Sequence, residues 1–212
     1  MNQTAYHKAK QIEATPGAPV HNGDVLVPGY DVEGKLWTVQ YIKEDGTKRF
    51  AKNSRKHGCF HVVGAANGAA ALQKIALSPV VVIAEGYATA ATIAKHGKVQ
   101  ALAAYDSGNL LSVATSLHQR YPDKAIVIAV DDDHGIENNP GREKALAAAE
   151  AVAGVAIFPN FSAEQRGKGL TDFNDLAIQN PELVSRQLDD VLHGVKEQGL
   201  AASQSIELAP AV

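Results

Sequence analysis

The sequence predicts an α/β protein with a mostly parallel sheet, flanking helices and a small antiparallel β-rich subdomain in front of it. Two continuous apolar runs, at 80–84 and 125–130, have the length and the β-branched content of strands that are buried on both faces. From residue 65 onward, segments of helical character alternate with apolar runs of this kind. Such alternation is typical of a parallel sheet whose strands are joined by helices.

Local composition divides the chain into four parts. Residues 1–22 form a polar N-terminal segment, in which Pro-Gly-Ala-Pro at 16–19 ends a short helix at 5–12. Residues 23–64 form the β-rich subdomain, because 35–42 alternates with period two and Asp45-Gly46 is a strong hairpin signal. Residues 65–192 form the main domain, and we expect 193–212 to be a flexible tail.

The main domain is predicted to contain four strands, at 80–84, 99–104, 125–130 and 155–158. Helices are predicted at 65–77, 87–97, 109–120, 141–153, 170–178 and 181–192. Gly97 is a suitable helix end, and Pro181 suits a first helical turn.

Composition excludes several classes of protein. With 212 residues and 45% hydrophobic content, the chain can build one substantial core, and its net charge of −3 requires any nucleic-acid-binding surface to be local. The single cysteine, Cys59, excludes a disulfide framework and a Cys-rich zinc module. There is no apolar run of about 18 residues and no signal-peptide core. We therefore expect a cytoplasmic protein without membrane contact.

Acidic residues follow both buried strands. Glu85 and Gly86 end the first strand, and Asp131, Asp132 and Asp133 end the second. Asp131 and Asp133 point the same way if the strand geometry persists, whereas Asp132 points elsewhere. Carboxylates that converge at one sheet edge repel each other unless a cation lies between them, so the pattern predicts Mg²⁺ or Mn²⁺ and phosphoryl or nucleotidyl transfer. The alternative is a solvated acidic turn that caps helices.

This arrangement resembles the Toprim domain, in which one apolar strand ends in Glu-Gly and a later one ends in Asp-x-Asp. Bacterial-type primases, type IA and type II topoisomerases, OLD-type nucleases and some recombination proteins share that domain. The resemblance covers about 80–180 and implies a Rossmann-like fold. It also implies that Glu85, Asp131 and Asp133 are the metal-binding and catalytic acids, with Glu85 able to act as a general acid or base.

Further segments resemble plasmid and phage primases of the TraC type. They are Glu-Gly-Tyr-Ala-Thr-Ala-Ala at 85–91, the region 131–142, Lys-Gly-Leu-Thr-Asp-Phe-Asn-Asp at 168–175, and the preceding block 31–64. The resemblance implies that Asp172 and Asp175 extend the metal site and that Lys168 binds the nucleotide. Gly86 is a further nucleotide-binding candidate, because it lets the chain turn into a helix whose N-terminus favours an anion. A helix cap is the alternative role for Asp172. Arg142, a third nucleotide-binding candidate, follows residues that replicative primases lack, so we expect it on a longer loop.

A basic block precedes the main domain. Cations there outnumber Glu44 and Asp45, and aromatic residues lie between them, as in surfaces that track a single-stranded backbone and stack on bases. The alternative is a solvated hairpin whose aromatic residues fill its own core. The candidate DNA-binding residues are Lys43, Lys48, Arg49, Lys52, Arg55 and Lys56.

Two other polar residues are weaker candidates. Asp106 follows the strand at 99–104 and is the more plausible as a helix cap, and His134 lies beside the acidic cluster. No histidine spacing in the sequence matches a zinc site.

Three functional hypotheses remain open. The first is a Mg²⁺-dependent DNA primase catalytic domain that joins ribonucleoside triphosphates into short primers on single-stranded DNA. Resemblance implies plasmid conjugation or replication as its setting, with a helicase or template-binding protein as partner. The second is a Toprim nuclease that uses the same acids. The third is a non-catalytic nucleic-acid-binding module that needs a partner. This hypothesis remains because the sequence lacks the zinc module with which replicative primases engage their template.

Overall fold

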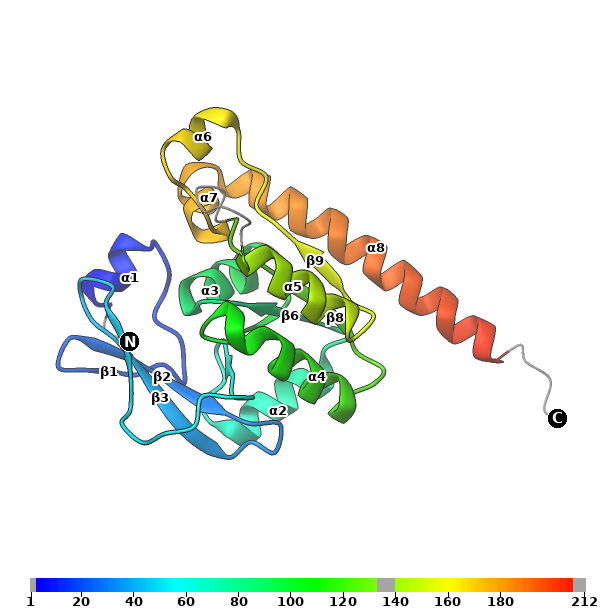
Figure 1. The fold of residues 1–212 in the computed structure, drawn as a ribbon, viewed down its shortest axis with the longest axis horizontal. Coiled ribbons are helices and arrows are strands. Elements are labelled where there is room, and N and C mark those ends of the chain that lie inside the picture. The colour runs from blue at the N-terminus through cyan, green and yellow to red at the C-terminus, as the bar shows by residue number, and fades with distance from the viewer. Residues whose placement is uncertain (1–2, 133–139, 208–212) are drawn as a thin grey trace.

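The computed structural model describes residues 3–132 and 140–207, and a five-stranded sheet in the order β5-β7-β6-β8-β9 forms its centre (Figure 1). Its strands are β5 (His61–Val62), β6 (Val80–Ala84), β7 (Gln100–Ala103), β8 (Ala125–Ala129) and β9 (Val155–Ile157). Strand β6 is parallel to β7 and β8, β8 is parallel to β9, and only the edge strand β5 is antiparallel to its neighbour. The predicted mostly parallel sheet is therefore confirmed.

Helices cover both faces of this sheet. Val80 and Val82 of β6 pack in one apolar cluster with α3 (Tyr87–His96), α7 (Phe173–Gln179) and α8 (Pro181–Glu207). Val81 and Ile83 pack in a second cluster with α2 (Gly68–Leu77), α4 (Leu110–Arg120) and α5 (Pro140–Glu150). Successive side chains of a strand point to opposite faces, and burying each Val or Ile contributes about 1.5–3 kcal/mol. This two-sided burial explains why the β6 and β8 sequences are almost entirely apolar.

A smaller antiparallel sheet precedes the main one, as predicted. It consists of β1 (Val20–His21), β2 (Asp24–Tyr30), β3 (Leu36–Ile42) and β4 (Lys48–Phe50). Strands β3 and β4 form the expected hairpin, where Gly46 has a φ of +84°, a left-handed conformation that glycine adopts without strain. Val25, Val27 and Ile42 are fully buried and join the cluster that contains α3. The small sheet thus packs on the main domain through its apolar face.

Two element boundaries differ from the sequence-based expectation. Strand β5 lies inside the range 23–64 that we assigned to the β-rich subdomain, yet His61 and Val62 pair with Ala103 and Leu102 of the main sheet. Helix α8 continues to Glu207, well beyond the predicted end at 192, so the expected tail begins as helix. The glycines and serines that suggested a tail do not stop a helix whose first turns are already packed, because elongation is cheaper than nucleation.

Short helical segments complete the chain. They are α1 (Ala5–Ala9), the 3₁₀ turn η1 (Ser107–Asn109) that leads into α4, and α6 (Ala163–Gly167). Figure 1 shows α4 and α5 side by side and α8 extending away from the sheet toward the C-terminus.

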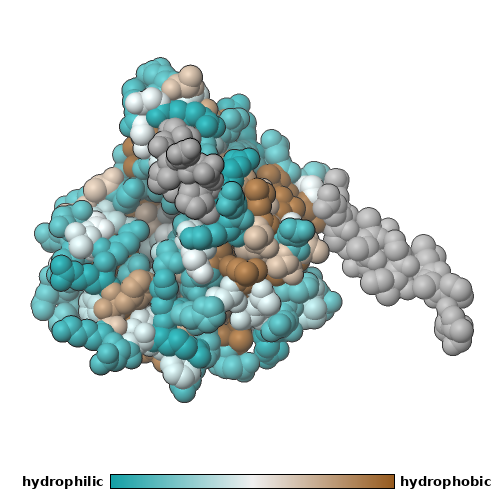
Figure 2. All heavy atoms as spheres, in the orientation of Figure 1, coloured by the Kyte–Doolittle hydropathy of each residue, from teal (hydrophilic) through white to brown (hydrophobic). Residues whose placement is uncertain are grey.

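The face seen in Figure 2 is largely hydrophilic, with apolar residues gathered over α5 and β9. Leu146 of α5 and Val155 of β9 are among the large hydrophobic residues that remain exposed. In the part of the chain that the structure describes, every helix is too short or too polar to cross a membrane.

The buried histidine of β5 predicts a pH dependence of stability. His61 is fully buried, its ring lies edge-on to Tyr87 at 5.6 Å, and burial lowers the pKa of its imidazole to about 4. An unfolded histidine has a pKa of about 6.5, so the unfolded state binds more protons between these values and native stability falls as the pH falls through that window. His61→Gln removes this loss.

Urea unfolding of the native chain and His61→Gln at several pH values between 7 and 4 measures the effect. The native free energy of unfolding should decline relative to that of the variant by up to about 1.4 kcal/mol per pH unit. The exposed His21→Gln serves as the control and should follow the native pH profile. Parallel profiles for the native chain and His61→Gln would contradict the assignment.

Candidate active site

Glu85 and Asp131 lie at the same edge of the main sheet. Ala84 of β6 pairs with Ala129 of β8; Glu85 follows Ala84 directly, and Asp131 follows Ala129 after one residue. Both acids are partly buried. Because ligands on open α/β sheets bind beyond the carboxyl ends of the strands, two of the three predicted acids stand where a site is expected.

A pocket of about 150 Å³ opens at this edge. Its lining combines acidic side chains with lysines from the N-terminal segment and from the β-hairpin, so a ligand meets both negative and positive groups there. Such a combination suits a phosphate group accompanied by a divalent cation. The residues that line the pocket are Tyr6, Lys10, Gly46, Lys48, Gly86, Ala88, Thr89, Asp131 and Asp172.

Lys48 reaches from the hairpin to the first turn of α3. A Cβ atom placed on Gly86 would lie 3.6 Å from Nζ of Lys48. Gly86 is the N-cap of α3 with a φ of −108°, which any residue adopts, so this glycine provides room and is not needed for a left-handed turn. The start of α3 and the Lys48 ammonium therefore lie at one pocket, and both favour an anion.

Asp172 both caps a helix and lines the pocket. Its Oδ1 accepts a hydrogen bond from the backbone N–H of Asp175 at 2.7 Å, so the predicted N-cap of α7 is present. Burial and, to a lesser extent, the charge of Asp175 raise the pKa of Asp172. The Nζ of Lys10 lies 3.4 Å from Asp175 Oδ1 and 4.0 Å from Asp172 Oδ2. The cap and the contact with Lys10 thus use different oxygens of Asp172.

Asp132 points elsewhere than Asp131, as the strand geometry predicted. It is 5% exposed, and its Oδ2 lies 3.1 Å from Nη2 of Arg166 on α6. Its backbone N–H donates to the carbonyl of Thr171 at 2.7 Å. These contacts fasten the end of β8 to the segment that carries Asp172.

The donor chemistry of this edge fits Mg²⁺ or Mn²⁺. The carboxylates of Glu85, Asp131 and Asp172 are hard oxygen donors, and a nearby cation would relieve the cost of burying the Asp172 charge. Within residues 3–132 and 140–207, no group of three or more His, Cys, Asp or Glu side chains is arranged to hold a metal ion. Asp133 and His134 lie outside the described residues, so their predicted roles stay predictions.

The six cations of the basic block have different environments. Lys43 lies 3.0 Å from Asp24. Arg55 forms an ion pair with Asp31 at 3.1 Å and stacks 3.8 Å from the ring centre of Trp37. Four cations remain: Lys48 lines the pocket, Lys56 pairs with Asp106, and Arg49 and Lys52 are exposed.

A buried asparagine ties the basic block to the main sheet. The Asn109 side chain is 2% exposed; its Nδ2 donates to the carbonyls of Cys59 at 2.9 Å and Ala104 at 2.8 Å. Its Oδ1 accepts from the backbone N–H of Gly58 at 2.9 Å. With the ion pair between Lys56 and Asp106, these bonds hold the loop at 55–59 against the end of β7. Asp106 therefore anchors the loop, and it does not line the pocket.

Two predicted nucleotide-binding residues lie away from the pocket lining that the structure describes. Lys168 follows α6 and pairs with Glu164 at 2.7 Å. Arg142 lies in the first turn of α5, with its guanidinium 4.0 Å from the ring centre of Phe158. The expectation of a longer loop at Arg142 was wrong, because Pro140 already begins the helix.

Sequence reasoning missed the residues that the N-terminal segment contributes. Tyr6 and Lys10 line the pocket, although they lie far from the acids in sequence. The only local signal was Thr4, which forms a capping box with His7 and so starts α1. That signal predicts a helix and says nothing about where the helix docks.

Comparison with known proteins identifies the domain. Residues 80–182 match the Toprim domain family. The chain contains a Toprim domain. It resembles two Escherichia coli proteins named DNA primase TraC, one 52% identical over 167 residues and the other 47% identical over 208 residues. The matches cover 75% and 96% of this chain, which spans only 11% and 18% of those relatives.

Solved primase structures share the fold of this Toprim protein. The primase fragment of the bacteriophage T7 primase-helicase protein aligns with a TM-score of 0.54 at 13% identity, covering 79% of this chain and 64% of that one. The DnaG primase catalytic domain bound to ssDNA aligns with a TM-score of 0.50 at 14% identity, covering 88% of this chain and 56% of that one. The likeness shows that the chain shares the fold of these primase domains.

The dual position of Asp172 predicts different stabilities for two variants in the absence of metal. Asp172→Asn keeps a good N-cap and removes a carboxylate whose charged form burial disfavours, so it should stabilise the chain in EDTA at pH 7. The advantage should shrink as the pH falls, because the raised pKa of Asp172 favours its neutral form in the native chain. Asp172→Ala loses the cap and should cost about 1 kcal/mol relative to Asp172→Asn.

Urea unfolding in EDTA measures both variants, and repetition with Mg²⁺ shows whether the native chain gains more stability from the ion than Asp172→Asn does. An Asp172→Asn chain that is less stable than the native chain in EDTA at pH 7 would contradict the assignment.

Proposed function

We propose that this chain is the metal-dependent catalytic core of a DNA primase, which joins ribonucleoside triphosphates into short primers on single-stranded DNA. One observation carries the proposal: Glu85 and Asp131 follow paired parallel strands at one sheet edge, where Asp131 and Lys48 of the basic hairpin line the same pocket. Acids for a divalent cation and a lysine for phosphate are then combined at one sheet edge. The similarity to proteins named DNA primase TraC supports the choice among Toprim activities.

The acids have the role of holding the cation. Glu85 and Asp131, with Asp133 from the segment outside the described residues, are the proposed ligands, and Asp172 and Asp175 extend the site. A bound Mg²⁺ or Mn²⁺ supplies charge neutralisation for a triphosphate during in-line attack by a 3′ hydroxyl. Glu85 is also the proposed general acid or base.

The cations of the chain position the two substrates. Lys48 and the first turn of α3 would bind the nucleotide phosphates. Arg49 and Lys52 are exposed on and just after the hairpin, so they are better placed for template phosphates than the paired Lys43, Arg55 and Lys56. Lys168 and Arg142 are weaker candidates, because each already has another contact.

The setting of this activity is part of the proposal. The similarity to proteins named DNA primase TraC supports priming, and the sequence resemblance to plasmid primases suggests plasmid conjugation or replication as the setting. The name of the T7 primase-helicase protein supports a helicase or another template-binding protein as partner. Since the chain spans only a small part of its TraC relatives, such a partner function can also reside in a longer protein.

Incorporation of labelled ribonucleotides on circular single-stranded DNA with Mg²⁺ tests the proposal. Asp131→Asn should lower primer synthesis by at least about 100-fold, as loss of a group that stabilises the transition-state charge does. Asp123→Asn is the matched control, because Asp123 is exposed in the turn before β8, and it should leave synthesis unchanged.

Other outcomes decide against primer synthesis. Degraded DNA in place of primers would identify a nuclease that uses the same acids. Intact, bound DNA without product would indicate a nucleic-acid-binding module that needs a partner.

The two neighbouring lysines should separate nucleotide from template binding. Lys48→Gln should raise the KM for ribonucleotides by roughly tenfold, because it removes a charged hydrogen-bond donor from the pocket. Lys52→Gln should leave that KM unchanged and weaken DNA binding, lowering the salt slope of log K by about 1. Steady-state kinetics and fluorescence anisotropy on labelled single-stranded DNA measure the two effects. Equal effects of both variants on KM would contradict the assignment.

A further inference from the structure

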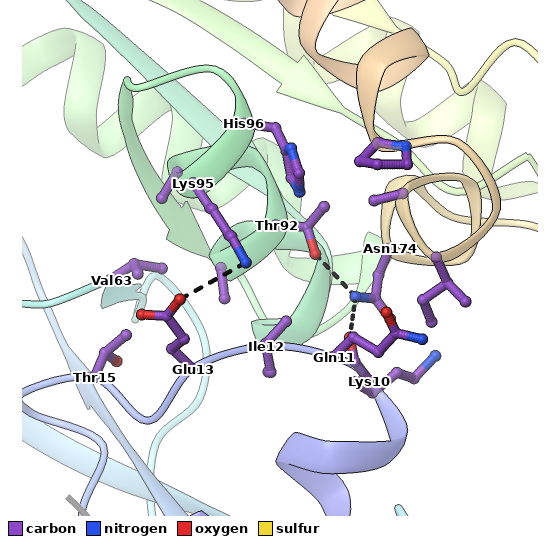
Figure 3. A pocket seen from close by; sticks show the side chains of 15 residues that line it. Lys10, Gln11, Ile12, Glu13, Thr15, Val63, Thr92, Lys95, His96 and Asn174 are labelled. Atoms are coloured by element: carbon purple, nitrogen blue, oxygen red, sulfur yellow. Dashed lines mark hydrogen bonds and ion pairs between the residues drawn. The ribbon is translucent and has the colours of Figure 1, made fainter.

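A second and larger cavity lies on the outer side of α3. Its volume is about 510 Å³, and it is enclosed by the N-terminal segment from Lys10 to Thr15, by α3 from Ala91 to His96, and by α7 (Figure 3). The acidic pocket lies at the other end of α3, at Gly86. Only Lys10 lines both spaces among the described residues.

The walls of this cavity are formed mainly by small aliphatic side chains. The apolar lining includes Ala91 and Ala94 of α3, Ala177 and Ile178 of α7, and Ile12. Small side chains leave the walls smooth, and the volume lies within the range of about 300–1,000 Å³ that is usual for small-molecule sites. The cavity can therefore accept a flat organic group.

A buried hydrogen-bond acceptor lies in the lining. Asn174 is 1% exposed, and its Nδ2 donates to the carbonyl of Lys10 at 2.7 Å and to Oγ1 of Thr92 at 2.9 Å. A carbonyl can only accept, so the orientation of the amide is fixed. The remaining atom, Oδ1, is buried and has no hydrogen-bond partner among the described residues. An unsatisfied buried acceptor destabilises the folded chain, and a ligand with an N–H donor would remove that cost.

Basic groups surround the opening. Lys95 and Lys10 line the cavity together with a single acid, Glu13, and His96 lies beside them. Lys95 and Glu13 are 3.7 Å apart, with side chains 52% and 75% exposed, so their ion pair is weak and opens easily. Figure 3 shows Lys95 and Glu13 pointing toward each other at one side of the cavity. An anionic group would replace Glu13 there at little cost.

We propose that this cavity is a nucleotide-binding site that is separate from the acidic pocket. A base that carries an exocyclic amine would lie between the alanines of α3 and α7, with the amine donating to Oδ1 of Asn174. The 5′-phosphate would lie near Lys95. The same chemistry is presented by a free nucleotide and by the 5′-phosphorylated end of a nucleic acid.

Isothermal titration of the whole chain with AMP in EDTA tests the site without metal or template, so the result does not depend on primase activity. Saturable binding is expected with one AMP per chain. Purine riboside 5′-monophosphate lacks the amine and should bind roughly tenfold more weakly. A 5′-phosphorylated adenylyl dinucleotide that binds more tightly than AMP would identify a nucleic-acid end as the occupant, and one that binds more weakly would identify a free nucleotide.

Two variants locate the binding. Ala177→Leu fills the cavity and should weaken AMP binding at least tenfold, with thermal unfolding as the check on its fold. Lys95→Glu reverses an exposed charge at the opening and should weaken binding at least fivefold. The control Lys144→Glu reverses an exposed charge on α5, outside the cavity lining, and should leave binding unchanged. The proposal would be overturned if neither AMP nor the 5′-phosphorylated dinucleotide bound saturably to the native chain. Equal affinities of Lys95→Glu and Lys144→Glu for AMP would also overturn it.

Discussion

The parallel pairing of β6 with β8 is the constraint on which the site depends. Its register sets Ala84 opposite Ala129 and therefore carries Glu85 and Asp131 to one edge. The pair is stable only where both faces are covered, and parallel strands need long crossover connections. The helices that supply the cover also begin at the sheet edge, as α3 does after Gly86. The packing that buries the strands therefore also brings the site residues together.

Electrostatics links the two sheets. Acids lie at the edge of the main sheet, and cations extend from the hairpin of the small sheet and from the N-terminal segment. Lys48 and Lys10 enter the acidic pocket, while Lys56 and Asp106 pair across the boundary. These pairs are partly exposed, so each contributes little to stability. The apolar contacts of Val27 and the hydrogen bonds of Asn109 hold the sheets together and leave the charges available for a ligand.

Most of the main domain could be predicted from sequence because its signals are local. Continuous β-branched runs identified β6 and β8, alternation identified β3, and Asp45-Gly46 identified the hairpin. The pairing of β5 with β7 could not be predicted, since two residues carry no periodicity and the contact joins distant parts of the chain. The full length of α8 was missed for a related reason. Composition indicates where a helix can end, whereas tertiary packing decides whether it continues past that point.

The candidate site shows the same division. Glu85 and Asp131 could be found because each directly follows a strand that was itself recognisable. Lys10 could not, because its position depends on the docking of α1 and on the bond from Asn174 to its carbonyl. That bond fixes the backbone of Lys10, while its side chain, 33% exposed, carries the ammonium to 4.0 Å from Asp172 and 3.4 Å from Asp175. A cation held by such weak, partly exposed contacts can be displaced by a divalent ion at modest cost. The chain therefore keeps its acids close together without binding them irreversibly to its own lysine.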